Sequence, residues 1–176
     1  LMITAVGDSA SSGMRKGEMF HFDSVCSCVE TALHQAEEAA NLTINEVYLA
    51  MSGSQIEGMP NRGEIPVDGE ITPDHVEHVL RVAREVTLPA DRQILHSIVG
   101  QYSVDGLAGV RPVGMTGKTL AADVLIVHGL YSRMLNLVRV AKSQKLEVAE
   151  LLFSGLCSAM SALSAEQKLQ GVLLID

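Results

Sequence analysis

The sequence changes character abruptly after residue 53. Before that point, apolar residues recur at helical spacing between Val25 and Ala40, and a dense apolar run, EVYLAMSG, occupies 46–53. These patterns predict a helix followed by a buried strand. Residues 54–71, rich in glycine and proline, predict turns with at most an edge strand near 63–67. The break indicates that a second module interrupts an α/β pattern.

Further elements are expected on both sides of this break. Thr72 followed by Pro73 is typical of a helix start, and Asn41 is a plausible stop for the first helix. The other expected strands are 3–7, 19–22, 93–104, 118–129 and 171–176, and the other expected helices are 131–144 and 147–163. The predicted fold class is therefore α/β with a smaller inserted α+β module. We place its parts at 1–53, 54–146 and 147–176.

Composition narrows the classes of partner. The formal charge is −8 and aromatic residues make up 3% of the chain, so neither charge nor stacking favours nucleic acid. Three cysteines, at 26, 28 and 157, predict reduced thiols rather than a disulfide framework. The chain does not begin with Met and ends on an apolar run, GVLLID, so we expect a piece of a longer protein.

The stretch GMTGKT at 114–119 has the ending of a phosphate-binding loop. Such a loop needs a glycine five residues before the glycine of Gly-Lys-Thr, but that position is Pro112, which has no N–H. The motif should also open a helix, whereas here it precedes a predicted strand. We expect a glycine-containing loop here and no phosphate cradle.

The histidines raise one alternative function, that of a metal-dependent enzyme. His75 and His78 are three apart on a predicted helix, which is a spacing that metal ligands use. A solvent-facing charged turn explains them better, because no third ligand is evident, and a metal-dependent enzyme stays the weaker alternative. His96 and His128 lie in apolar strands and are expected to be partly buried, hydrogen-bonded imidazoles rather than catalytic bases. No Gly-x-Ser-x-Gly nucleophile motif is present.

Several segments together resemble FtsA, the actin-like bacterial cell-division family. The combination of ILH…QY.VDG with PVG.(S/T)G..L.A.V..V is specific, whereas any one piece alone is weak. The matching stretches are MRKGEMFHFDSV (14–25), EVYLAMSGSQI (46–56), ITPDHVEHVLRVA (71–83), RQILHSIVGQYSVDG (92–106), RPVGMTGKTLAADVLIVHG (111–129), ELLFSGLCSAMSAL (150–163) and GVLLID (171–176). The pilus-assembly protein PilM is a more distant alternative, which would make the chain part of an ATPase of the actin and chaperone superfamily.

The resemblance implies a partial actin-like, ribonuclease H-like half-core. The outer segments correspond to subdomain 1A, and the insert to subdomain 1C, a strand-helix-strand-strand module. In this family subdomain 1C makes contacts with neighbouring FtsA molecules and with division proteins. Arg111, Lys118 and the loop 105–117 are the candidate contact residues in this sequence.

The resemblance also implies a nucleotide site in the longer protein. Actin-like proteins hold ATP and Mg²⁺ between two phosphate loops, and Asp176 would open the second of these loops. This stretch alone is expected to hold no cofactor or metal and to have no catalytic residues, while the parent protein binds or slowly hydrolyses ATP. Contacts with FtsZ and with the cytoplasmic face of the inner membrane are expected to use other parts of the parent.

Overall fold

The computed structural model describes residues 2–175 and divides the chain into two compact units. Unit 1 combines Leu1–Gln55 with Leu130–Asp176, and unit 2 is the continuous stretch Ile56–Gly129. Unit 2 therefore interrupts unit 1 in the sequence, as the change of character after residue 53 predicts.

Unit 1 starts with a small hairpin and a long helix. Strands β1 (Met14–Arg15) and β2 (Glu18–Met19) pair antiparallel across a turn in which Lys16 and Gly17 have positive φ. Helix α1 (Phe22–Ala40) follows and ends at Asn41, whose φ of 50° and ψ of 47° are left-handed. Asparagine tolerates this conformation better than most residues, so the predicted stop at Asn41 is confirmed.

A parallel strand pair forms the sheet of unit 1. Strand β3 (Glu46–Met51) pairs with β8 (Glu147–Phe153), and helix α3 (Tyr131–Ser143) contacts both strands as well as α1. Parallel strands need a crossover connection, and α3 is the helix of that crossover. The predicted insert, 54–146, thus extends beyond unit 2 by residues 54–55 and 130–146, and the second of these stretches contains α3.

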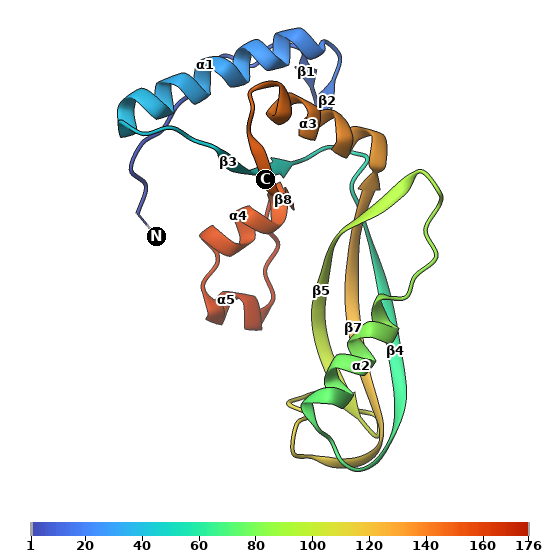
Figure 1. Ribbon diagram of the computed structural model, residues 1–176. Coiled ribbons are helices and arrows are strands. Elements are labelled where there is room, and N and C mark those ends of the chain that lie inside the picture. The colour runs from blue at the N-terminus through green and yellow to red at the C-terminus, as the bar shows by residue number, and fades with distance from the viewer. Residues whose placement is uncertain (1, 176) are drawn as a thin grey trace. The chain divides into compact units, whose positions relative to one another are not determined.

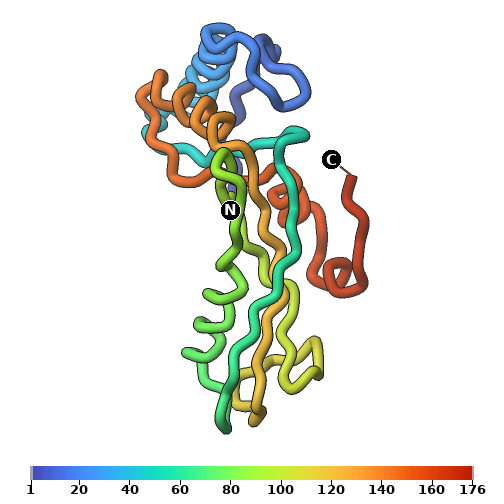
Figure 2. Tube along the Cα trace, turned by 90° about the vertical axis from the view of Figure 1, so that its right-hand side faces the viewer, coloured from blue at the N-terminus to red at the C-terminus, as the bar shows by residue number. Residues whose placement is uncertain are grey.

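Unit 2 is a four-stranded sheet with one helix on one face (Figure 1). Strand β4 (Glu57–Glu70) pairs antiparallel with β7 (Thr116–Leu130), β5 (Arg92–Val104) lies beside β7, and the short β6 (Leu107–Val110) pairs with the end of β5. Helix α2 (Pro73–Arg84) lies along this sheet (Figure 2). Its start at Thr72 and Pro73 confirms the prediction.

The core of unit 2 lies between α2 and one face of the sheet. Alternate residues of β4 and β7 point toward α2, and Gly63 lets the helix approach so closely that a Cβ there would lie 2.4 Å from the backbone nitrogen of Ala83. The buried members of this core are Ile65, Val67, Ile71, Val79, Ala83, Val104, Leu120, Ala122, Val124 and Ile126.

Strand β4 is longer than the sequence predicts. Residues 54–71 were expected to form turns with a short edge strand, but β4 runs for 14 residues. It is an edge strand with β7 on one side, so Pro60 and Pro66 need not donate to a second neighbour. Pro66 also lies next to the register shift that separates it from Gly69.

Other differences concern the ends and one helix. The predicted helix 147–163 is strand β8 followed by α4 (Ser154–Ala162), because residues 147–153 gain a parallel partner in β3. Residues 3–7 and the described part of 171–176 lie outside helices and strands, and α5 (Ala165–Gln170) was not predicted. Among residues 2–175, none of the helices has both the length and the apolar character required to span a bilayer.

Candidate protein-interaction surface

The loops at one end of the sheet in unit 2 are fastened to its strands. The end lies at the bottom of Figure 1, where β5 turns into β6 and the chain returns into β7. The backbone of Ile71 donates to the carbonyl of Met115 (2.8 Å) and accepts from the N–H of Gly114 (2.9 Å). These bonds hold the loop after β6 against the end of β4, so its exposed side chains are presented from a fixed backbone.

Asp105 fixes the other part of this end. Its Oδ1 accepts from the backbone N–H of Lys118 (2.9 Å), the backbone N–H of Thr119 (2.8 Å) and the Thr119 hydroxyl (3.2 Å). The two backbone N–H groups hold the pKa of this carboxyl below its ordinary value of 3.8. The Gly-Lys-Thr of GMTGKT therefore binds an anion of the chain itself, at the start of β7.

The predicted contact residues lie at this end. Arg111 and Lys118 are both exposed, as are two large apolar side chains, Leu107 at 63% and Val113 at 54%. We call these four residues the distal surface. The structure thus brings Arg111 and Lys118 to one end of unit 2, and their role in binding a partner stays a prediction. Asp176 lies outside the described residues.

The sheet face away from α2 carries a polar network that the sequence did not indicate. Arg62 donates to Asp123 Oδ1 and to Ser103 Oγ, both at 2.9 Å, and Gln101 donates to Asp123 Oδ2 at 3.0 Å. The hydrogen bond from Gln101 and the one from Arg62 lower the pKa of Asp123. We call Arg62, Gln101, Ser103 and Asp123 the open face. In the sequence, only the alternation of apolar and polar residues along β4 and β7 could have indicated this polar network.

The histidines of unit 2 have structural partners. His75 Nδ1 accepts from the Thr72 N–H at 3.2 Å, which closes the first turn of α2, and His78 is exposed. His128 is 5% exposed and its Nδ1 lies 2.8 Å from Arg92 Nη1, while Arg92 also bonds to Glu57. Arginine only donates, so Nδ1 of His128 accepts and the proton sits on Nε2. The expected role of His128 as a buried, satisfied imidazole is confirmed.

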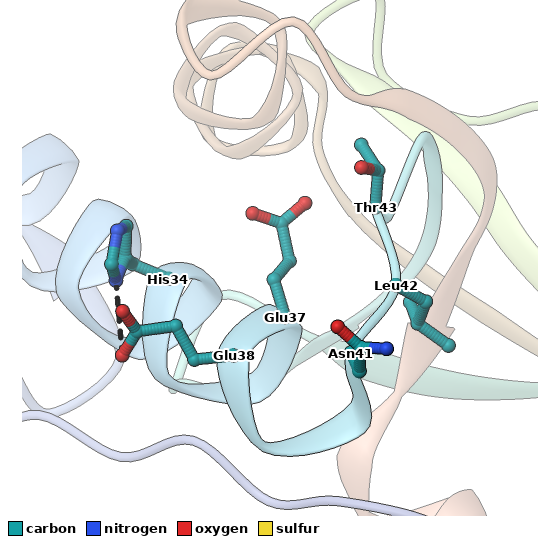
Figure 3. A pocket seen from close by; sticks show the side chains of 6 residues that line it. All are labelled: His34, Glu37, Glu38, Asn41, Leu42 and Thr43. Atoms are coloured by element: carbon teal, nitrogen blue, oxygen red, sulfur yellow. Dashed lines mark ion pairs between the residues drawn. The ribbon is translucent and has the colours of Figure 1, made fainter.

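A separate hollow of about 330 Å³ lies at the end of α1 in unit 1 (Figure 3). His34 and Glu38 form an ion pair of 3.5 Å on one side of it, and both side chains are 70% exposed. Glu37 accepts from the backbone N–H of Ile44 at 2.8 Å. The Glu37 bond fastens the turn after α1. The His34–Glu38 pair lies within the helix, and an ion pair this exposed contributes little energy. No group of three or more metal-ligating side chains occurs among the residues described in either unit.

Comparison with known proteins places these features in a family. Residues 53–128 match the SHS2 domain inserted in FtsA. The whole chain is 33% identical over 180 residues to the cell division protein FtsA of Borreliella burgdorferi, of which it covers 44%. It is 34% identical over 176 residues to the cell division protein FtsA of Escherichia coli K12, covering 99% of this chain and 42% of that protein. The chain thus spans less than half the length of these relatives.

A solved structure shares the fold. A chain of the PilM–PilN type IV pilus biogenesis complex superposes with a TM-score of 0.52 over 86% of this chain and 40% of its own length, at 12% identity. An identity this low concerns the fold alone. Together with the SHS2 match, it confirms the predicted partial actin-like half-core with an inserted α+β subdomain.

Proposed function

Because the chain belongs to the FtsA family of bacterial cell-division proteins, we propose that it acts in division as an assembly module. Its task is to make protein–protein contacts rather than to catalyse a reaction. The observation that carries this proposal is the match of the whole chain to FtsA, with the SHS2 match covering unit 2 except its last residue.

The distal surface supports a contact role for unit 2. Leu107 and Val113 expose apolar area at the same end of unit 2 as the cationic Arg111 and Lys118. Apolar side chains bordered by charge are a common composition for a protein interface. The partners we propose are further FtsA-like subunits and other division proteins.

The setting of the longer protein is also a proposal. We infer that it works at the cytoplasmic face of the inner membrane, and that it contacts FtsZ and the membrane through segments other than this one. We further propose that the longer protein binds ATP with Mg²⁺. Within residues 2–175, the Lys118 and Thr119 N–H groups do not fit a nucleotide phosphate, because Asp105 already occupies them. The PilM likeness gives no separate support for a pilus function, since it concerns the fold.

The proposal is tested in the bacterium that encodes the protein. The full-length protein with Leu107→Asp and Val113→Asp replaces the native copy, and cell length and recovery of division proteins by affinity purification are measured. We expect filamentous cells and loss of partners at unchanged protein level. Leu42→Asp is the control, because Leu42 is 50% exposed but lies in unit 1. Normal division by the double variant would contradict a role for the distal surface.

A further inference from the structure

Strand β5 has one side along which most of its length has no neighbouring strand. The order in the sheet is β4-β7-β5-β6, so β7 pairs with one side of β5 and β6 with the other. Strand β6 has four residues, and it reaches only Tyr102, Ser103 and Val104 of β5. Within the described chain, the outer side of residues 93–101 therefore has no strand beside it.

The two edges of this sheet are built differently. The outer edge of β4 carries Pro60 and Pro66, with the charged Arg62 and Glu64 between them. Prolines and charges are the devices that keep an edge strand from pairing with another chain. Residues 93–101, QILHSIVGQ, contain no proline, lysine, arginine or acidic residue, and Ile94 is 39% exposed. The β5 segment thus carries no proline or charge of its own, and the cation beside it is Arg84 of α2, which bonds to Ser97.

We propose that this edge pairs with the same edge of a second copy of the chain, as antiparallel strands around a two-fold axis at Ser97. A two-fold axis perpendicular to a sheet places residues at equal distances from the centre opposite each other. Ser97 then faces Ser97, Leu95 faces Val99, and Gln93 faces Gln101. These three pairs are chemically matched, whereas Ile94 faces Gly100 and His96 faces Ile98. No residue of the segment is a carboxylate or an amine, and the charge beside the axis is Arg84, whose Nε donates to Ser97 Oγ at 3.2 Å.

The length of the edge that has no neighbouring strand fits this register. Residues 93–101 extend four positions to either side of Ser97, and β6 occupies the edge from Tyr102 onward. In the symmetric pair, the two β6 strands therefore lie at the two ends of the new ladder and limit it to 93–101. The inference rests on the proposed function, since it assigns one of the assembly contacts of unit 2 to a second copy.

A cysteine at the two-fold axis tests the pairing directly. In the full 176-residue chain, Ser97→Cys places two thiols opposite each other, and mild oxidation should give a covalent dimer. Glu64→Cys on the protected β4 edge is the matched control, and the wild type measures cross-linking by the native Cys26, Cys28 and Cys157. We expect dimer from Ser97→Cys well above both controls.

A charge at the same position tests the equilibrium. Sedimentation of the wild type should show a concentration-dependent dimer. Ser97→Lys sets two ammonium groups against each other, so this dimer should disappear in the variant. Ser97→Ala is its control, because both variants lose the 3.2 Å hydrogen bond from Arg84 Nε but only lysine adds charge. We expect Ser97→Ala to keep the dimer, and circular dichroism checks that all variants fold.

Two results would overturn the pairing. One is a wild-type chain that stays monomeric at all accessible concentrations while Ser97→Cys cross-links no more than Glu64→Cys does. The other is a dimer that survives Ser97→Lys unchanged, which would place the interface elsewhere. Neither result contradicts the proposed role in division, because that role is tested by cell length and partner recovery. Conversely, normal division by the distal-surface variant would not contradict the pairing of β5, because the pairing is tested by cross-linking and sedimentation.

Discussion

The two faces of the sheet in unit 2 use opposite chemistry on the same strands. Toward α2, residues such as Ile65, Leu120 and Ile126 are buried at 4% exposure or less. On the open face, the same strands contribute Arg62 and Asp123 to a hydrogen-bonded polar network. Because side chains alternate between the two faces along each strand, one residue contributes to the core and the next to the polar face. Mutations at neighbouring positions should therefore change the free energy of unfolding by very different amounts.

The sharpest test of this separation is a cavity on the covered face. Leu120 is fully buried, so Leu120→Ala should lower the free energy of unfolding by about 3 kcal/mol through lost burial and an unfilled cavity. Leu125→Ala is the control from the same strand, because Leu125 is 40% exposed and should cost less than about 1 kcal/mol. Urea unfolding, monitored by circular dichroism, measures the free energy of unfolding of both variants. Equal losses in the two variants would contradict the difference between the faces.

The second test adds a methyl group instead of removing one. At Gly63 a Cβ would lie 2.4 Å from the Ala83 nitrogen, so Gly63→Ala must push α2 away from the sheet. We expect a loss of about 2 kcal/mol. At Gly58, on the same strand, the nearest atom is the Leu125 Cδ1 at 3.3 Å, and this half-exposed side chain can move. Gly58→Ala should therefore be nearly neutral in the same unfolding measurement.

The sequence predicts the covered face better than the open one. The helix start at Thr72 and Pro73 and the apolar stripe of α2 are local signals, and the structure confirms them. The full length of β4 is not predictable locally, because Pro60 and Pro66 oppose a strand unless the strand is known to lie at an edge. Sheet order is a property of the fold rather than of any local pattern.

The site shows the same limit. Arg111 and Lys118 could be recognised as exposed candidates from a glycine-rich loop and a family resemblance. The backbone N–H groups of Lys118 and Thr119 donate to Asp105, more than a dozen residues earlier in the chain. The only local signal for these bonds is the Asp-Gly pair, which is typical of a turn. Likewise β8 takes its strand conformation from pairing with β3, about a hundred positions earlier in the chain. Tertiary pairing overrides local helical pattern there.

The third test concerns pH at the distal end. The pKa of Asp105 is lowered in the folded chain, so its carboxylate stabilises the fold above pH 3.8 and loses this effect as pH falls through the lower folded pKa. Asp105→Asn keeps an acceptor and tolerates the φ of 47°. We expect the variant to melt at a lower temperature than the wild type at neutral pH, with a gap that narrows steadily below pH 3.8. A gap independent of pH would contradict the role of the charge.

The smallest effect is expected at the centre of the open face. Arg62→Met removes the hydrogen bonds to Asp123 and Ser103 while keeping much of the side-chain volume, and both Arg62 and Asp123 keep contact with solvent. An ion pair this exposed contributes about 1 kcal/mol or less, so urea unfolding should shift far less than for Leu120→Ala. Asp123→Asn should cost a similar amount, and the double variant less than the sum, because the two side chains bond to each other. If Arg62→Met lowered the free energy of unfolding as much as Leu120→Ala does, the open face would stabilise unit 2 as strongly as its core.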